Sequence, residues 1–340
     1  MGVNLFAMNH ELLWEDPDIY VIRVPFANFG LEHTNCYVVR DGDEALVIDV
    51  GVISPAARKA ITKAVADIGV DLSTARFFCT HLHFDHVALI KKASAPGSHI
   101  VMSRTAFELN PRNNYRARRA TTKRELNKEG IKRFAKSGLA AVMAESRVCD
   151  LAGRVYECVG DGDVLRVGKH ELRVIETPGH AVGHLCLYSD EQQFLFSGDH
   201  ILEKTTPGLA LPHDGHDTVA EYLDSLNKVD NLPVRVVFPG HGEAFFTLHD
   251  RCAALREHHA MRMGNAYELI ALNPGISGND LVRKMPWKRS GPFKQKVWDR
   301  LNAHMRLSLG VQTLAYLEYL VNLGEIVREE VDGVNRYHVV

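Results

Sequence analysis

Four short β-forming runs in this sequence end directly in histidine or aspartate, and this repeated pattern limits the fold more than any other feature. The first run, 75-ARFFCT-80, leads into 81-HLHFDH-86, which holds three histidines and an aspartate in six positions. The other three lead into 177-TPGH-180, 197-SGDH-200 and 238-FPGH-241, each with a glycine beside the polar side chain. Strand ends hold side chains rigidly, and glycine lets the backbone turn tightly around a ligand. The pattern therefore indicates a layered α/β fold whose strand ends carry a metal site.

The two halves of the chain are β-rich in a similar way. Short β-forming runs open the sequence and return after residue 150, with helix-forming segments between some of them. One helix is predicted at about 55–68, with Ser54 as its N-cap and Pro55 at its first position. The runs lack the regular strand–helix–strand alternation of a Rossmann-type sheet. We therefore expect an α/β (α+β) protein built as a four-layer αββα sandwich.

Two segments fall outside this sandwich pattern. Residues 104–146 are helical and polar in pattern, which predicts a helical insertion. After residue 250 the pattern becomes helical and ends in two strand-like arms around Asp332-Gly333, a dipeptide typical of β-hairpins. We therefore divide the chain into a catalytic domain at 1–250 and a small winged-helix-like domain at 251–340.

Composition narrows the setting in which the protein works. A formal net charge of -2 and a pI near 6.8 disfavour a protein dominated by nucleic-acid or membrane electrostatics. No apolar stretch approaches the ~20 residues of a membrane span, and the N-terminal stretch lacks the features of a signal peptide. The six cysteines are scattered without a C-x-x-C pair, which is typical of free thiols in a reducing compartment. We expect a cytoplasmic protein.

The four polar motifs, in their order along the chain, resemble those of the metallo-β-lactamase superfamily of hydrolases. The resemblance covers residues 18–250 and implies a site for two metal ions. It assigns His81, His83 and His180 to one ion, Asp85, His86 and His241 to the other, and Asp199 to both. Asp49, in 46-LVIDVG-51, matches an early aspartate of the family and is expected to accept an N–H bond from a ligand imidazole. His184 and His200 stand near these positions, either touching substrate or serving the structure.

The ligand types indicate which metals and which chemistry to expect. Imidazole and carboxylate without thiolate suit two divalent ions, zinc first, with iron or manganese as alternatives. Two such ions about 3.5–4 Å apart can share a water and lower its pKa from ~15.7 to ~7. A metal-bridging hydroxide is then the predicted nucleophile for a carbonyl, with Asp85 orienting it and carrying a proton toward the leaving group. No G-x-S-x-G motif offers a serine nucleophile instead.

The ligand set fixes a chemistry but not a substrate. The insertion and the tail resemble the subfamily of lactamase-domain proteins with an associated winged helix, whose members hydrolyse acyl thioesters or, in an animal branch, cleave single-stranded RNA. Ten Lys or Arg against two Glu lie between Asn110 and Ser137. Arg116, Arg118 and Arg119 in this stretch would attract an anionic substrate, whereas a solvated helix face is the plain alternative.

We therefore expect a thioesterase acting on an acyl-CoA-like small molecule. A lactonase with the same mechanism and a single-stranded RNA endonuclease are the enzymatic alternatives. A nucleic-acid-binding or regulatory protein that uses the fold as a scaffold is an alternative of another class, which the acidic hairpin at 326–337 disfavours. Homo-oligomerisation is left open, and no membrane partner is expected.

Overall fold

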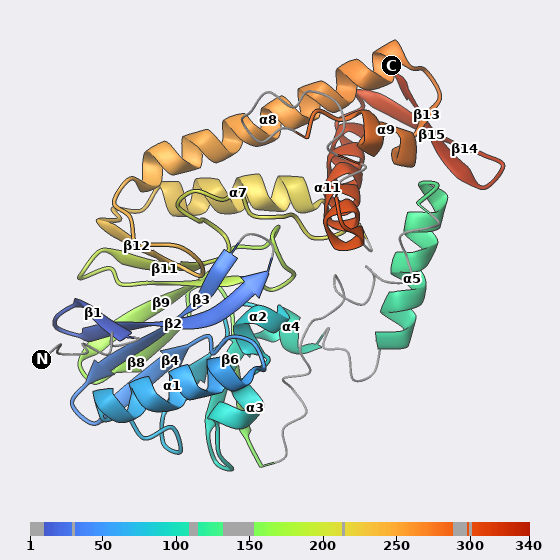
Figure 1. The fold of residues 1–340 in the computed structure, drawn as a ribbon. Helices are drawn as coiled ribbons and strands as arrows, with labels where there is room; N and C mark the ends of the chain where they lie inside the picture. The colour runs from blue at the N-terminus through green and yellow to red at the C-terminus, as the bar shows by residue number, and fades with distance from the viewer. Residues whose placement is uncertain are drawn as a thin grey trace, which may run out of the picture.

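The computed structural model of the protein describes residues 10–28, 31–108, 115–131, 153–212, 215–287, 298 and 301–340. Two β-sheets pack face to face, and helices cover the outer face of each (Figure 1). The predicted four-layer αββα sandwich is confirmed. A third, small sheet lies near the C-terminus. Among the described residues, no helix combines the length and the apolar character needed to cross a membrane.

The first sheet has seven strands in sequential order, antiparallel from β1 to β4 and parallel from β4 to β7. Both of its faces are buried, as β2 illustrates: Ile19 and Val21 face the second sheet, while Ile22 and Val24 face the outer helices. Its strands are β1 (His10–Trp14), β2 (Asp18–Asn28), β3 (Leu31–Asp41), β4 (Glu44–Ile48), β5 (Arg76–Phe78), β6 (His99–Ser103) and β7 (Val155–Val159).

The second sheet has the order β12-β11-β10-β9-β8, in which only the β11–β12 pair is parallel. Aromatic rings fill the space between the sheets, where Phe196 lies 5.2 Å from both Tyr37 and Phe238 between ring centroids. The strands of this sheet are β8 (Val164–Val167), β9 (His170–Glu176), β10 (Leu185–Tyr188), β11 (Phe194–Gly198) and β12 (Val236–Pro239).

Helix α1 (Pro55–Ile68) shows how local sequence determines an element. The Ser54 side chain accepts a hydrogen bond from the backbone N–H of Ala57, and Gly69 ends the helix at a φ of 79° that favours glycine. The predicted helix and cap are confirmed. With α1, three short helices line the outer face of the first sheet: α2 (Phe84–Val87), α3 (Ile90–Ala93) and α4 (Arg104–Glu108).

Helices from two parts of the chain cover the second sheet. They are α7 (Thr218–Asp230), the first part of α8 (Leu248–Leu272), and α11 (Ala303–Asn322). The rest of α8 packs against the C-terminal elements, which are β13 (Ile276–Ser277), α9 (Gly278–Lys284), β14 (Ile326–Val331) and β15 (Val334–Val339). Asp332 and Gly333 have φ angles of 51° and 73° and form the predicted hairpin turn between β14 and β15. Because α8 runs unbroken through residue 250, the expected domain boundary falls inside a helix, and the winged-helix-like domain stays a prediction.

The described part of the insertion is α5 (Tyr115–Lys128) and the turn after it. The rest of the predicted stretch 104–146 after α4 lies outside the described residues, as do the side chains of Arg116, Arg118 and Arg119. The turn places a buried carboxylate, Glu129, against β15, where its Oε1 accepts hydrogen bonds from the Asn335 side chain and, at 2.9 Å, from the Tyr337 hydroxyl. The insertion is therefore joined to the C-terminal sheet by a buried polar contact.

Replacing Glu129 tests this contact through the pH dependence of stability. Burial raises the pKa of Glu129 above its usual 4.5, although Asn335 and Tyr337 oppose the shift. The raised pKa contributes stability below pH 4.5 that is lost as pH rises through the folded-state value. The glutamine of Glu129→Gln stays neutral and cannot lose stability in this way. As the pH rises through the folded-state pKa of Glu129, the free energy of unfolding of the variant should therefore fall less than that of the wild type.

Chemical denaturation at a series of pH values measures the effect, with the exposed Glu330→Gln as control. The titratable groups that wild type and variant share contribute equally to both free energies of unfolding, so they cancel when the two curves are subtracted. Glu129→Ala, which leaves Asn335 and Tyr337 without their acceptor, should cost about 1–3 kcal/mol. Parallel curves for wild type and Glu129→Gln would show that Glu129 is ionised alike in the folded and unfolded states.

Candidate metal centre

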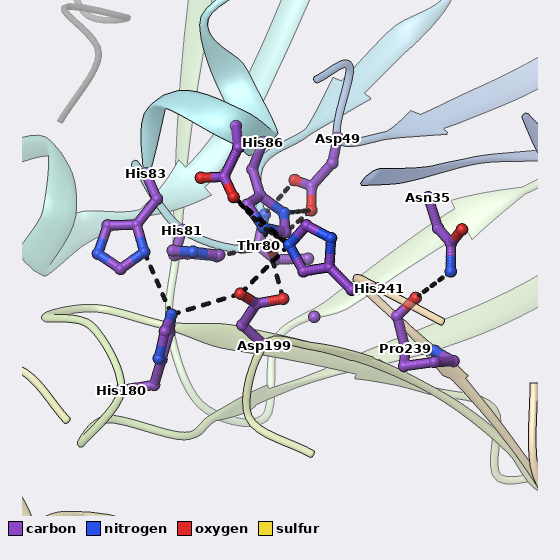
Figure 2. Close-up of polar contacts among 12 residues, drawn as sticks. Asn35, Asp49, Thr80, His81, His83, His86, His180, Asp199, Pro239 and His241 are labelled. Atoms are coloured by element: carbon purple, nitrogen blue, oxygen red, sulfur yellow. Dashed lines mark hydrogen bonds and ion pairs between the residues drawn. The ribbon is translucent and has the colours of Figure 1, made fainter. Parts of the chain in front are cut away.

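The four polar strand ends meet in one cluster (Figure 2). The turn from β5 into α2 supplies the residues from the first half of the chain. The loop after β9 and the ends of β11 and β12 supply those from the second half. The seven side chains predicted as ligands come together here: His81, His83, Asp85, His86, His180, Asp199 and His241.

These side chains form overlapping groups of three, and the ligand-type atoms within each group lie within 4.8 Å of one another. In the first group, His83 Nδ1 and His180 Nε2 are 3.2 Å apart. In another, His241 Nε2 lies 3.2 Å from His86 Nε2 and 3.4 Å from Asp85 Oδ2. The groups are His81, His83 and His180; Asp85, His86 and His241; and His81, His86 and Asp199.

Asp199 lies between the two sides of the cluster. Its Oδ2 is 3.6 Å from the Nε2 atoms of both His180 and His241, and its Oδ1 is 3.4 Å from His86 Nε2. A single carboxylate thus reaches imidazoles of both predicted ligand sets. Gly240 permits this close packing, because a Cβ there would lie 2.5 Å from Asp199 Oδ1.

Fixed hydrogen bonds determine which ring nitrogen of each imidazole faces the centre. His180 Nδ1 lies 2.6 Å from the carbonyl oxygen of Gly208, and His241 Nδ1 lies 2.7 Å from that of His33. Carbonyl oxygens only accept, so both Nδ1 atoms must carry the hydrogen. The neutral ring of each residue therefore presents a bare Nε2 to the cluster.

The same conclusion holds for two residues of the first half. His86 Nδ1 donates to Asp49 Oδ2 at 2.7 Å, and the Thr80 hydroxyl donates to that same oxygen at 2.7 Å. Because its only hydrogen goes to Asp49, Thr80 Oγ1 accepts from His81 Nδ1 at 3.0 Å. His81 Nε2 is buried and has no hydrogen-bond partner among the described residues, as is the case for Asp199 Oδ1.

Burial and neighbouring charges set the protonation of these groups. Burial lowers the pKa of His180 to about 4 and that of His81 well below its usual range, so both rings are neutral at pH 7. Burial would raise the pKa of Asp199, yet His241 and His86 hold it well below its usual range. Burial likewise opposes the charge on His86, but Asp199 and Asp49 raise its pKa well above the usual value.

The pair His86 and His241 gives a direct test of whether a cation fits. Both Nδ1 atoms donate outward, so two Nε2 lone pairs would face each other at 3.2 Å. Such lone pairs repel unless a proton or a metal cation lies between them. The two orphaned atoms at His81 and Asp199 point to the same need for an electrophile. The residues therefore fit a centre of divalent cations.

His184 and His200 are both fully buried. His184 Nε2 accepts the backbone N–H of Asp199 at 3.1 Å, and its Nδ1 lies 2.7 Å from Thr177 Oγ1. Both ring nitrogens of His184 are thus engaged, and the ring holds the chain segment that carries Asp199. The sequence left a structural role for His184 open as one of two alternatives and did not indicate its contact with Asp199. It missed Thr80, whose signal is its place immediately before His81.

A sequence profile of the Metallo-beta-lactamase superfamily matches residues 29–241, well over half of the chain and all seven residues of the cluster. The chain belongs to this superfamily. Membership implies divalent metal ions, in agreement with the clustered histidines and aspartates, and leaves the identity of the metal open.

Relatives in the superfamily are distant. Lactamase-like protein aptB of Emericella nidulans is 25% identical over 253 residues, which cover 74% of this chain and 65% of that protein. Acyl-coenzyme A thioesterase MBLAC2 of Gallus gallus is 28% identical over 235 residues, covering 67% and 78%. An atrochrysone carboxyl ACP thioesterase of Aspergillus fumigatus is 24% identical over 225 residues, covering 65% and 56%. The match therefore spans less than two thirds of the length of both fungal relatives.

Solved superfamily structures share the fold over nearly the whole chain. A metallo-beta-lactamase family protein of Thermus thermophilus has a TM-score of 0.76 at 23% identity and covers 95% of this chain and 98% of its own. A beta-lactamase domain protein of Burkholderia ambifaria has a TM-score of 0.73 at 24% identity, covering 99% and 97%. The shared fold thus includes the helices and the hairpin after residue 250.

Thr80→Val tests whether the Asp49–Thr80–His81 contacts orient the site. Valine has nearly the same shape but removes the donor to Asp49 and the acceptor for His81. We expect metal affinity to fall about 10- to 100-fold, as is usual when a partner of a ligand imidazole is lost. Competition with a chromogenic zinc chelator measures this.

The matched control is Thr74→Val, because the Thr74 hydroxyl donates to the Asp71 carbonyl oxygen in an exposed turn. Its zinc affinity should equal that of the wild type. If Thr80→Val also binds zinc as tightly as the wild type, His81 is oriented by packing alone.

Proposed function

We propose that the protein is a binuclear metal-dependent hydrolase of acyl thioesters. The observation that carries the proposal is the placement of Asp199 between two groups of ligand-type side chains. Relatives named as acyl-CoA and acyl-carrier-protein thioesterases support the substrate class. The five described cysteines are free thiols, which supports a cytoplasmic location.

In this proposal the ligands divide as the superfamily resemblance implies. His81, His83 and His180 would hold one ion, and Asp85, His86 and His241 the other, with Asp199 shared. Nitrogen and oxygen ligands without thiolate favour zinc, with iron and manganese as the other candidates. When bound, the ions would supply Lewis acidity toward a substrate carbonyl and toward water.

Asp85 is the residue that we assign to proton transfer. Burial would raise its pKa, but the hydrogen bond with His241 and the charge of His86 lower it, so the carboxylate is ionised at neutral pH. Hydrolysis forms a bond from a water oxygen to the acyl carbon and breaks the carbon–sulfur bond. Asp85 can accept the proton released by the water and return it to the departing sulfur, which yields a carboxylic acid and a thiol.

Asp49 has a supporting role in the same proposal. Its Oδ2 accepts from His86 and from Thr80, and its Oδ1 accepts the backbone N–H of Thr80 at 3.0 Å. These contacts fix the ring orientation of two ligand imidazoles, His86 directly and His81 through Thr80. Asp49 thereby keeps the Nε2 atoms of His86 and His81 directed at the centre when substrate enters.

The first test joins metal content to turnover. Purified protein should contain up to two equivalents of zinc or iron, and His83→Ala should abolish hydrolysis of an acyl-CoA while the circular dichroism spectrum is retained. The loss follows because His83 supplies one of the three imidazoles of the first group. A chromogenic thiol reagent measures the product.

His99→Ala removes an exposed histidine and serves as the matched control, with unchanged activity expected. Acyl-CoA, acyl-glutathione, a homoserine lactone, a cephalosporin and single-stranded RNA should be compared with the same metal-loaded protein. Unchanged turnover in His83→Ala would disprove the two-metal proposal. Preference for the lactone or for RNA would reassign the substrate and leave the centre intact.

A second test concerns the basic stretch in α5, whose contribution is predicted from the sequence alone. Replacing Arg116, Arg118 and Arg119 with glutamine should raise KM for acyl-CoA about 10-fold, if each of three ion pairs with the substrate contributes about 0.5 kcal/mol. KM for a short uncharged thioester should not change. The same replacements at Arg166, Lys169 and Arg173 in the β8–β9 hairpin are the control. Equal changes with both substrates would assign α5 a purely structural role.

A further inference from the structure

One strand of the first sheet holds the loop that carries His241. The loop at residues 239–242 begins at the last residue of β12 in the second sheet, and Asn35 of β3 reaches across to it (Figure 2). The Asn35 side-chain amide donates to the carbonyl oxygen of Pro239 at 2.9 Å and to that of Gly242 at 2.8 Å. Its backbone N–H donates to the carbonyl oxygen of Gly240 at 2.8 Å. Three hydrogen bonds from one residue thus bracket His241.

The orientation of the Asn35 amide is unambiguous. Both loop acceptors are carbonyl oxygens, so the nitrogen of the amide and not its oxygen must face them. Asn35 is only 2% exposed, and its Oδ1 has no hydrogen-bond partner among the described residues. The amide nitrogen also lies 3.2 Å from the Tyr37 hydroxyl, but its two shorter contacts are the loop carbonyls. A buried amide that leaves its own acceptor unpaired while donating to two carbonyl oxygens of one loop holds that loop.

Neighbouring residues of β3 contact the same loop. The carbonyl oxygen of His33 accepts from His241 Nδ1, and the Tyr37 hydroxyl donates to the Pro239 carbonyl oxygen at 2.8 Å. Gly240 in turn packs against Asp199 and His86, because a Cβ there would lie 2.9 Å from His86 Cε1. A displacement of the loop would therefore change the distance between His241 and its partners from the first half of the chain.

We propose that Asn35 is a positioning residue that sets His241 for the ion predicted to lie among Asp85, His86 and His241. This inference rests on the proposed two-metal function. Asp85 and His86 follow β5 of the first sheet, whereas His241 follows β12 of the second. The group is therefore complete only when the loop with His241 keeps its position relative to the first sheet, and β3 of that sheet holds the loop. His180, in the other group, is held instead by the carbonyl of Gly208. Loss of Asn35 should therefore weaken one ion and spare the other.

Asn35→Asp is the sharpest variant. Aspartate has the same size but no N–H, and it turns a carboxylate oxygen toward the carbonyl oxygens of Pro239 and Gly242. The wild type should bind two equivalents of cobalt(II) with similar affinity in a spectroscopic titration. In Asn35→Asp the affinity for one equivalent should fall about 10- to 100-fold, while the other is unchanged. Zinc content after dialysis against a graded chelator should fall from two to one.

Tyr37→Phe is the matched control. It removes the hydroxyl that donates to Pro239 and accepts from the Asn35 amide at 3.2 Å, but leaves both contacts of the Asn35 side chain with the loop carbonyls. Its affinity for the more weakly bound equivalent of cobalt(II) should fall less than that of Asn35→Asp. Thermal unfolding of the apo proteins verifies the fold. If Asn35→Asp fails to fold, Asn35→Ala, which removes the donors without adding charge, is titrated in its place.

The outcomes separate the inference from the function on which it rests. Weakening of one equivalent alone supports the positioning role. Equal weakening of both equivalents, or of neither, overturns that role while the two-metal centre stands. A wild-type protein that binds fewer than two ions overturns both proposals together.

Discussion

The orientation of four imidazole rings determines the character of this site. His81, His86, His180 and His241 each direct Nδ1 toward an oxygen acceptor and Nε2 toward the common centre. An imidazole without such an acceptor can turn about its χ2 angle and offer either nitrogen. Here the acceptors belong to Thr80, Asp49 and two backbone carbonyls. The four Nε2 atoms therefore converge on one centre, which lowers the cost of organising a metal site.

Three of these four acceptors have fixed positions because they belong to the buried first sheet or to residues shortly after its strands. Asp49 follows β4, Thr80 follows β5 and the His33 carbonyl lies on β3, neighbouring strands of one sheet. Both faces of that sheet are covered by apolar residues, so the strands cannot shift without opening a core. Asp49 adopts a φ of 54°, a backbone conformation that aspartate tolerates better than most residues. The packing that stabilises the fold is also what fixes the positions of the polar atoms.

The sequence was sufficient to predict those elements that have a recognisable local sequence pattern. The spacing of His81, His83 and His86 and the Ser54-Pro55 cap are local patterns, and the structure has the corresponding turn and helix. The contacts of Asn35, Gly208 and His184 could not be predicted, because backbone carbonyl and N–H groups have no signature in a sequence. Glu129 was hidden in another way: in a stretch rich in Lys and Arg it reads as a surface residue, yet β15, from the far end of the chain, buries it.

Helix α8 belongs to two cores at once. Cys252 and Leu255 pack over the second sheet, together with Tyr316 of α11, whereas Ala266 and Ile270 pack among the C-terminal elements. A shorter chain that stopped near residue 250 would expose part of the apolar outer face of the second sheet to water. The residues after 250 therefore complete the core over the second sheet and are not a free-standing appendage.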